Sequence, residues 1–108
     1  MRLSTTFNIE CAHTIEEPVG VPVLHGHSYL ITVSVGTSPE APAPLPELQR
    51  FAGMVQSRLD HRHLNDLLAG RSTMEAIISF VRLAWPGPQL VGVKVERPTI
   101  GASAEWSA

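Results

Sequence analysis

The sequence predicts an α+β domain in which a four-stranded antiparallel sheet carries two helices on one face, in the order ββααββ. Apolar and polar residues alternate near both ends of the chain, which is typical of strands that bury one face. Between these regions apolar residues recur at steps of three and four, as they do in amphipathic helices. With 108 residues, 44% of them hydrophobic, the chain is expected to fold as one domain over residues 1–108.

The first two strands are expected to form an antiparallel hairpin. Residues 3–13 alternate, and one face of this run consists of Leu3, Thr5, Phe7, Ile9 and Cys11. Residues 14–23 contain two prolines and a glycine, which indicates a loop. A second alternating run covers residues 25–35 and would return beside the first.

Two helices are expected after a connector at residues 36–46, which holds four of the nine prolines. The apolar face of the first helix would consist of Leu45, Leu48, Phe51, Ala52, Val55 and Leu59. Ser72 and Glu75 have the spacing of a capping box and would begin the second helix. Its buried face would consist of Ile77, Ile78, Val81 and Leu83, and Pro86 would stop it.

The third strand is expected at residues 90–96 and a short fourth strand near residues 102–106. In the third strand Val91, Val93 and Val95 would face away from Glu96. A sheet this small leaves open edges, which pairing with other subunits would cover.

The composition excludes several classes of partner. A formal net charge of −2 gives no electrostatic case for binding nucleic acid or an acidic membrane. No apolar run approaches membrane-spanning length, and the N-terminal residues lack the apolar core of a signal peptide. A single cysteine excludes a disulfide within the chain and fits a reducing compartment. We therefore expect a cytoplasmic protein that binds neither nucleic acid nor a membrane.

Histidines suggest a metal site. His25 and His27 are one residue apart at the start of a strand, so both imidazoles would lie on one face. His13, at the end of the earlier run, offers a third imidazole. Three histidines with an open fourth position are an arrangement found in catalytic zinc sites. A pair of solvated histidines would explain the same motif without a metal.

Five segments resemble the 6-pyruvoyl- and 6-carboxy-tetrahydropterin synthases, a family with the T-fold. They occur in this order: Phe7-Asn8-Ile9-Glu10-Cys11-Ala12-His13, Leu24-His25-Gly26-His27-Ser28-Tyr29, Leu59-Asp60-His61-Arg62-His63-Leu64-Asn65, Ser72-Thr73-Met74-Glu75, and Val93-Lys94-Val95-Glu96 before Pro98-Thr99. The resemblance implies that His13, His25 and His27 bind Zn²⁺. It also implies a homo-oligomer, a trimeric barrel or a hexamer of two such barrels, with active sites between subunits.

The same resemblance implies roles for four more residues. Asp60 and His61 would be the catalytic pair, since a carboxylate orients an imidazole that titrates near neutral pH. Glu96 would bind the 2-amino-pyrimidinone edge of a pterin, with Thr73 adding a hydrogen bond. Without function, Asp60 would be a helix cap and Glu96 a solvated charge on a strand.

The sequence departs from the family at one catalytic position. The family cysteine lies four residues before the first histidine of His-Gly-His, and Val21 stands there in this chain. Cys11, the only cysteine, falls where the family has alanine. Our hypothesis is that Glu16 or Glu17, in the same loop, replaces the missing thiolate.

The resemblance thus predicts a zinc-dependent lyase that acts on 7,8-dihydroneopterin triphosphate or a related pterin. One alternative is a divergent paralogue that uses the same zinc site on a different cyclic substrate. Another is a non-catalytic oligomer that binds a pterin or a metal.

Overall fold

The computed structural model describes residues 1–16, 22–68 and 73–108, and within the first two strands it describes side chains up to residue 12 and again from residue 26. The elements follow in this order: β1 (Arg2–Glu16), β2 (Pro22–Gly36), α1 (Leu45–Leu59), α2 (Leu64–Leu67), α3 (Met74–Ala84), β3 (Leu90–Arg97), the 3₁₀ turn η1 (Pro98–Ile100) and β4 (Ala102–Ser107). The predicted α+β class is confirmed, and the one-turn helix α2 is an addition to the two predicted helices.

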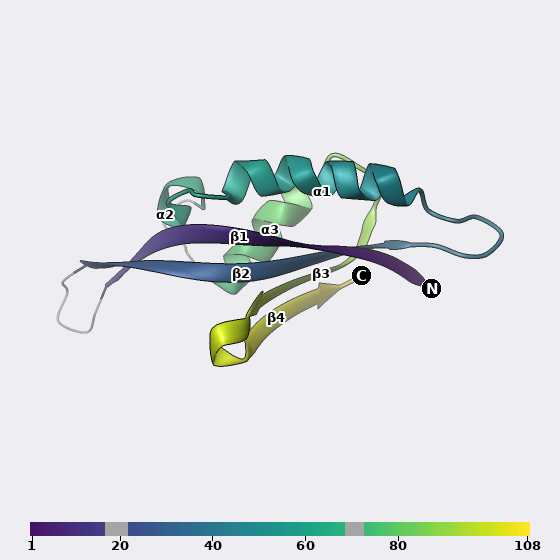
Figure 1. Cartoon of the computed structure of the whole chain (residues 1–108). Coiled ribbons are helices and arrows are strands. Elements are labelled where there is room, and N and C mark those ends of the chain that lie inside the picture. The colour runs from purple at the N-terminus through teal and green to yellow at the C-terminus, as the bar shows by residue number, and fades with distance from the viewer. Residues whose placement is uncertain (17–21, 69–72) are drawn as a thin grey trace.

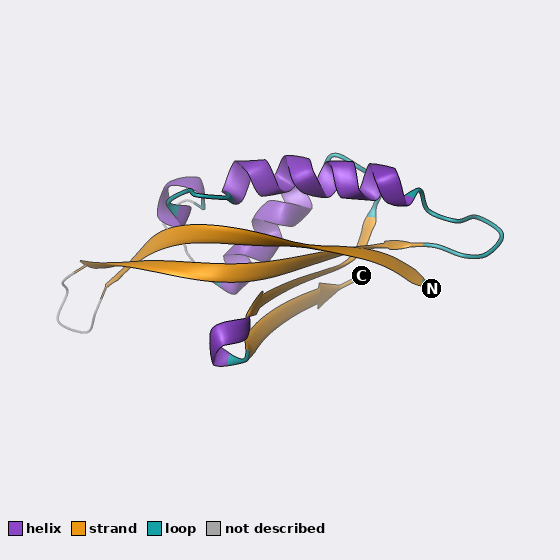
Figure 2. Cartoon of the chain, in the orientation of Figure 1, coloured by secondary structure: helices purple, strands orange, loops and turns teal. Residues whose placement is uncertain are grey.

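The four strands form one antiparallel sheet in the order β1-β2-β3-β4, and the helices lie on one of its faces (Figures 1 and 2). β1 and β2 pair along their whole length, from Arg2 opposite Gly36 to Glu16 opposite Pro22. The pairing of β2 with β3 starts only at Leu30. The first two strands therefore continue past β3 as a two-stranded ribbon (Figure 1).

The core lies between the sheet and the helices. Side chains that are 0% exposed come from both layers and comprise Ile9, Ile31, Val33, Leu59, Leu64, Ile77, Val81 and Val95. The opposite face of the sheet is polar, with hydroxyl pairs across the strands at Ser4–Ser34 (2.6 Å) and Thr6–Thr32 (2.8 Å). One apolar and one polar face explain the alternation seen in the sequence.

The helices α1 and α3 lie where the sequence predicts them, but the N-cap of α3 and the exposure of Leu83 differ from the prediction. α1 begins and ends where the apolar pattern predicts. The prediction that Ser72 caps α3 in a capping box with Glu75 was wrong, because the N-cap is Thr73, whose hydroxyl accepts the N–H of Ala76 at 3.1 Å. Leu83, predicted to be buried, is 88% exposed because it lies on the outer side of α3.

The strands depart further from the prediction, both in their bounds and in the residues that they bury. β1 and β2 run to Glu16 and from Pro22, well inside the predicted loop, since the hairpin pairing continues outward. A register shift opposite Ser34 and Val35 places Leu90, and not Val91, on the buried face of β3. Among the described residues, no helix is both long and apolar enough to cross a membrane.

Candidate metal and acid–base site

The ribbon formed by β1 and β2 carries the three predicted metal-binding histidines. The register pairs His13 with His25 and Cys11 with His27. Directly opposed residues of an antiparallel pair share a face of the sheet, so these positions continue the helix-covered face that begins with Ile9. The side chains of His13 and His25 lie outside the described residues. The backbone register places these three positions on one face of the ribbon.

The imidazole of His27 contacts Arg97 and Tyr29. Its Nδ1 lies 2.9 Å from Nη2 of Arg97, and its ring meets the ring of Tyr29 edge to face at 6.1 Å. A guanidinium can only donate, so Nδ1 of His27 accepts this hydrogen bond.

Three imidazoles form a donor set that zinc accepts, with a fourth position open for another ligand. Within the part of the chain whose side chains are described, no group of three His, Cys, Asp or Glu residues lies close enough to hold a metal. The zinc site therefore remains a prediction that rests on the donor types and on the pairing of the strands.

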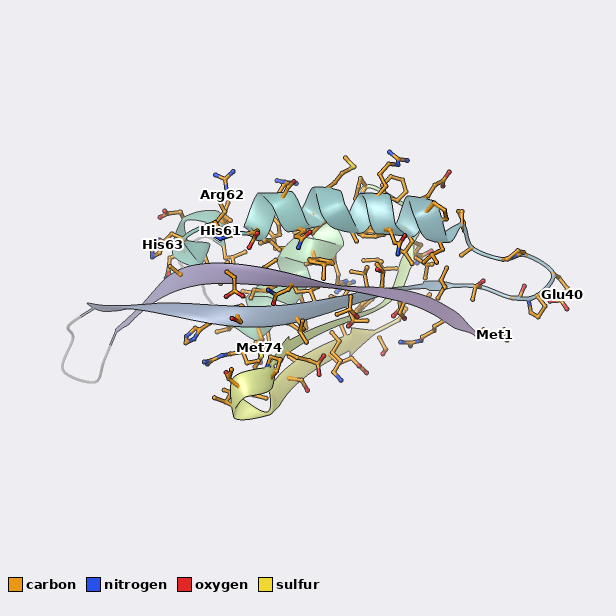
Figure 3. All side chains as sticks on the ribbon, in the orientation of Figure 1. Met1, Glu40, His61, Arg62, His63 and Met74 are labelled. Atoms are coloured by element: carbon orange, nitrogen blue, oxygen red, sulfur yellow. The ribbon has the colours of Figure 1, made fainter. Side chains whose placement is uncertain are left out.

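The predicted acid–base pair follows directly after α1, where the chain runs along the edge of β1. The N–H of His61 donates to the carbonyl of Glu10 at 2.7 Å, and the N–H of Ala12 donates to the carbonyl of Arg62 at 3.1 Å. Oδ2 of Asp60 lies 3.0 Å from Nδ1 of His61. Figure 3 shows His61 and Arg62 between the end of α1 and α2, beside β1. The segment thus pairs with β1 through an isolated bridge between Ala12 and His63, and this pairing places the imidazole beside the strand.

Hydrogen bonding keeps Asp60 ionised. The N–H of Glu10 donates to Oδ1 of Asp60 at 2.8 Å, and this bond lowers the pKa of the Asp60 carboxyl, with a smaller contribution from His61. The side chain of His61 is 79% exposed. A fixed, charged carboxylate therefore orients an imidazole whose other nitrogen is open to a ligand.

His61 also has an unusual backbone. Its φ is +57°, in the left-handed region that L side chains rarely adopt. Strain of this kind often occurs at functional sites, where the surrounding structure maintains it. In this chain the contacts of the segment with the edge of β1 hold the backbone in place.

A second carboxylate, that of Glu10, lies close to this pair. It accepts hydrogen bonds from Oγ of Ser28 at 2.6 Å and from Nδ2 of Asn8 at 2.9 Å. These two bonds lower the pKa of the Glu10 carboxyl, in that order of importance. Glu10 is therefore a fixed negative charge at neutral pH. The sequence does not single it out, because there it is an ordinary polar residue of an alternating strand.

A shallow pocket of about 590 Å³ connects the two predicted parts of the site. Its walls come from β1, β2 and the segment after α1, and the lining residues are Glu10, Cys11, Ala12, Gly26, His27, Ser28, His61, Arg62 and His63. One predicted metal ligand, His27, and the predicted base, His61, therefore face the same pocket.

Cys11 is not a reactive thiol. Its Sγ donates to the carbonyl of Leu59 at 3.3 Å, and the side chain is buried. Burial raises the pKa of the Cys11 thiol to about 12. At neutral pH the residue is a protonated thiol, unsuited to act as a base or to bind a metal.

The two predicted substrate-binding residues lie elsewhere. Glu96 pairs with Leu30 on the polar face of the sheet and contacts Lys94 at 3.4 Å. The hydroxyl of Thr73 caps α3. Neither residue lines the pocket of this single chain. The hypothesis about Glu16 and Glu17, like Val21, concerns side chains outside the described residues.

The fold and the site define an α+β protein in which a two-stranded ribbon brings histidine positions beside an Asp–His pair. The family model described as 6-pyruvoyl tetrahydropterin synthase matches residues 2–106, and the chain belongs to this family.

Solved structures agree with this assignment. The 6-pyruvoyl tetrahydropterin synthase of Caenorhabditis elegans is similar over 100% of this chain and 95% of that one, with 15% identity and a TM-score of 0.74. The enzyme of the same name from Plasmodium falciparum is similar over 100% and 98%, with 15% identity and a TM-score of 0.51. At these identities the similarity shows a common fold. No curated protein matches the chain at a significant level.

Proposed function

We propose that the chain is a zinc-dependent lyase that acts on 7,8-dihydroneopterin triphosphate or a related pterin. The observation that carries the proposal is the pocket that His27 and His61 line together. Membership of the synthase family supports the reaction class.

In this proposal His13, His25 and His27 hold Zn²⁺, with the register that pairs His13 with His25 as the supporting observation. When bound there, the ion would act as a Lewis acid on an oxygen of the substrate side chain and acidify the adjacent C–H. The residues of the chain must then bind the substrate, orient it and move the proton.

His61 is the proposed proton acceptor. Its Nδ1 faces Oδ2 of Asp60 at 3.0 Å, so Nε2 is the nitrogen that can take a proton from the substrate. Because Asp60 is ionised and held by the N–H of Glu10, it would stabilise the imidazolium that forms. The high exposure of His61 is compatible with return of the proton to water.

Substrate binding points to an oligomer. Glu96 is proposed to accept two N–H groups of the pterin ring, and Thr73 to add a hydrogen bond. Since neither lines the pocket of its own chain, we propose that subunits of a trimer or hexamer assemble the complete site.

The proposal is tested by incubating zinc-loaded protein with 7,8-dihydroneopterin triphosphate and identifying products by mass spectrometry. A zinc-dependent loss of triphosphate or a shortened side chain, absent from His25→Ala, is the expected result. No product despite bound zinc would overturn the proposed substrate.

A paired experiment addresses the missing thiolate. If Glu16 or Glu17 replaces it, then Glu16→Ala or Glu17→Ala lowers turnover while zinc binding persists. Full turnover in both variants would remove this hypothesis. In that case His61 would be the only residue of this proposal that accepts the proton.

Two observations favour a second function. Val21 cannot move a proton, and Cys11 is buried and protonated. These facts favour a paralogue that uses the same zinc site on a different cyclic substrate. Binding of a pterin without any turnover would instead indicate a non-catalytic oligomer.

A further inference from the structure

The carboxylate of Glu10 belongs to the pocket, but the proposed proton transfer does not use it. Glu10 lines the pocket together with Ser28 and His61. Its Oε1 accepts a hydrogen bond from Nδ2 of Asn8 at 2.9 Å, and its Oε2 accepts one from Oγ of Ser28 at 2.6 Å. These bonds orient the carboxylate and lower its pKa, so the group is ionised at neutral pH.

Both of these hydrogen bonds are donated to Glu10. An ionised carboxylate only accepts, and its oxygens offer about four acceptor positions, so positions beyond those used by Asn8 and Ser28 are open to a ligand. The hydroxyl of Ser28 gives its single proton to Glu10, so its Oγ presents only lone pairs to other groups. Glu10 and Ser28 therefore form an acceptor pair, two neighbouring side chains that offer acceptors and no donor to the pocket.

The charge of this acceptor pair is not balanced by a neighbouring cation. Among the described residues no Lys or Arg forms an ion pair with Glu10, whereas Glu96 has Lys94 at 3.4 Å. Arg62 also lines the pocket, but its side chain extends away from β1 in Figure 3. A hydroxyl group can donate to a carboxylate in a strong hydrogen bond, while a phosphate or a second carboxylate is repelled.

Glu10 supports the acid–base pair through its backbone, not through this carboxylate. Its N–H donates to Oδ1 of Asp60 at 2.8 Å, and its carbonyl accepts the N–H of His61 at 2.7 Å. A ligand group bound by the carboxylate would therefore lie close to the proposed base. The side chain of Glu10 can also be replaced while the backbone bonds to Asp60 and His61 persist.

We propose that Glu10 and Ser28 determine substrate specificity, because they bind hydroxyl groups of the substrate side chain and exclude an anionic group from the same place. This inference rests on the proposed function, since it concerns the side chain of the pterin on which His61 would act. A pterin with a hydroxylated side chain is accepted, and its triphosphate lies away from β1. A pterin with a carboxylate at the same place is rejected.

Pterin binding, followed by the fluorescence of the ligand, tests the hydroxyl contact. Neopterin carries hydroxyl groups on its side chain and 6-methylpterin carries none, so the ratio of their dissociation constants reports the side chain. Glu10→Gln keeps the size of the residue and replaces one acceptor oxygen by a donor. We expect it to reduce the preference of wild type for neopterin about tenfold, the effect of losing one hydrogen bond to a charged group.

The matched control is Glu105→Gln. Glu105 is an exposed carboxylate on β4 that does not line the pocket, so its replacement should leave the preference for neopterin unchanged. Ser28→Ala removes the other half of the acceptor pair and should lower the preference in the same direction as Glu10→Gln. Any contact of a hydroxyl group with zinc is common to wild type and Glu10→Gln, so it cancels in the comparison.

The exclusion of anions is tested with 6-carboxypterin, in which a carboxylate replaces the hydroxylated side chain. Glu10→Gln removes the repelling charge, so we expect it to bind 6-carboxypterin about threefold more tightly than wild type does. The same substitution thus weakens the binding of neopterin and strengthens that of 6-carboxypterin. A purely structural role of Glu10 would weaken the binding of both.

The outcomes separate this inference from the proposed function. If wild type binds none of the three pterins, both are overturned. If it binds them but converts no pterin, the proposed reaction fails, and the comparison of Glu10→Gln with wild type still tests the acceptor pair. An unchanged preference in Glu10→Gln, or equal weakening of all three pterins, overturns the role of Glu10 alone. A thermal melt of each variant confirms that it folds.

Discussion

The backbone N–H of Glu10 donates to the carboxylate of Asp60 at 2.8 Å, and the same carboxylate contacts His61 at 3.0 Å. The edge of β1 therefore fixes the group that orients the proposed base. This relationship couples the acid–base pair to the strand that also carries His13.

The pair can be tested through Asp60→Asn. The amide oxygen can still accept the N–H of Glu10, so the fold should persist, while the charge that stabilises an imidazolium on His61 is lost. We expect turnover to fall about 100- to 10,000-fold, the range for loss of general acid–base catalysis, with zinc affinity unchanged. The measurement is steady-state turnover of the zinc-loaded protein.

A second Asp–His pair in the same segment serves as the control. Asp66 contacts His63 at 3.3 Å and is 82% exposed, and it does not line the pocket. Asp66→Asn removes the same kind of charge, and its turnover should stay within about twofold of wild type. Equal losses in the two variants would indicate a general effect of charge and would refute the assignment of Asp60.

The pKa of Asp60 predicts a dependence of stability on pH. Because the folded-state pKa lies below its ordinary value of 3.8, the ionised carboxylate stabilises the fold above that value. This contribution is lost as the pH falls through the folded-state pKa. When urea unfolding is measured from about pH 6 to about pH 3, the free energy of unfolding of wild type should fall toward that of Asp60→Asn. A difference that stays constant over this range would show that ionisation of Asp60 does not stabilise the fold.

Cys11 should be dispensable for catalysis. Since burial raises its pKa to about 12, iodoacetamide should leave it unmodified in the folded protein at neutral pH and alkylate it in urea. Cys11→Ala should retain full turnover and lose about 1 kcal/mol of unfolding free energy, an ordinary value for a buried residue. Rapid alkylation of the folded protein with loss of turnover would make Cys11 a functional thiol.

Much of the fold follows from sequence pattern. The alternation and the helical periodicity predict the bounds of α1, the antiparallel hairpin and the positions of the last two strands. Details decided by packing do not follow from it. The apolar period of α3 cannot show that Leu83 is exposed, because a helix presents more apolar positions than this sheet covers. Two adjacent hydroxyl residues, Ser72 and Thr73, likewise offer two possible caps.

The sequence predicts only part of the site. The spacing of His25 and His27 gives their shared face, because the period of a strand is two. The contact of His27 with Arg97 joins residues 70 apart and depends on how β2 and β3 pair. A signal does exist, since Arg97 occupies a position where the alternation of β3 predicts an apolar residue.

The different exposures on α3 give a direct test of the core. Ile77 is 0% exposed and Leu83 is 88% exposed. Ile77→Ala should lower the free energy of unfolding by about 2–5 kcal/mol, because it leaves a cavity under the helix. Leu83→Ala should change it by less than about 0.5 kcal/mol. Urea titration measures both, and similar losses in the two variants would show that α3 packs through a different face.

Replacing His61 by two different residues can separate strain from chemistry. At a φ of +57° an alanine carries the penalty of an L residue in the left-handed region, and a glycine does not. His61→Gly should therefore be about 1 kcal/mol more stable than His61→Ala in urea unfolding. Both variants lack the imidazole, so both should lose turnover to the same extent. If alanine were as stable as glycine, the backbone of this segment would relax without His61, and the strain would belong to the imidazole and its contact with Asp60.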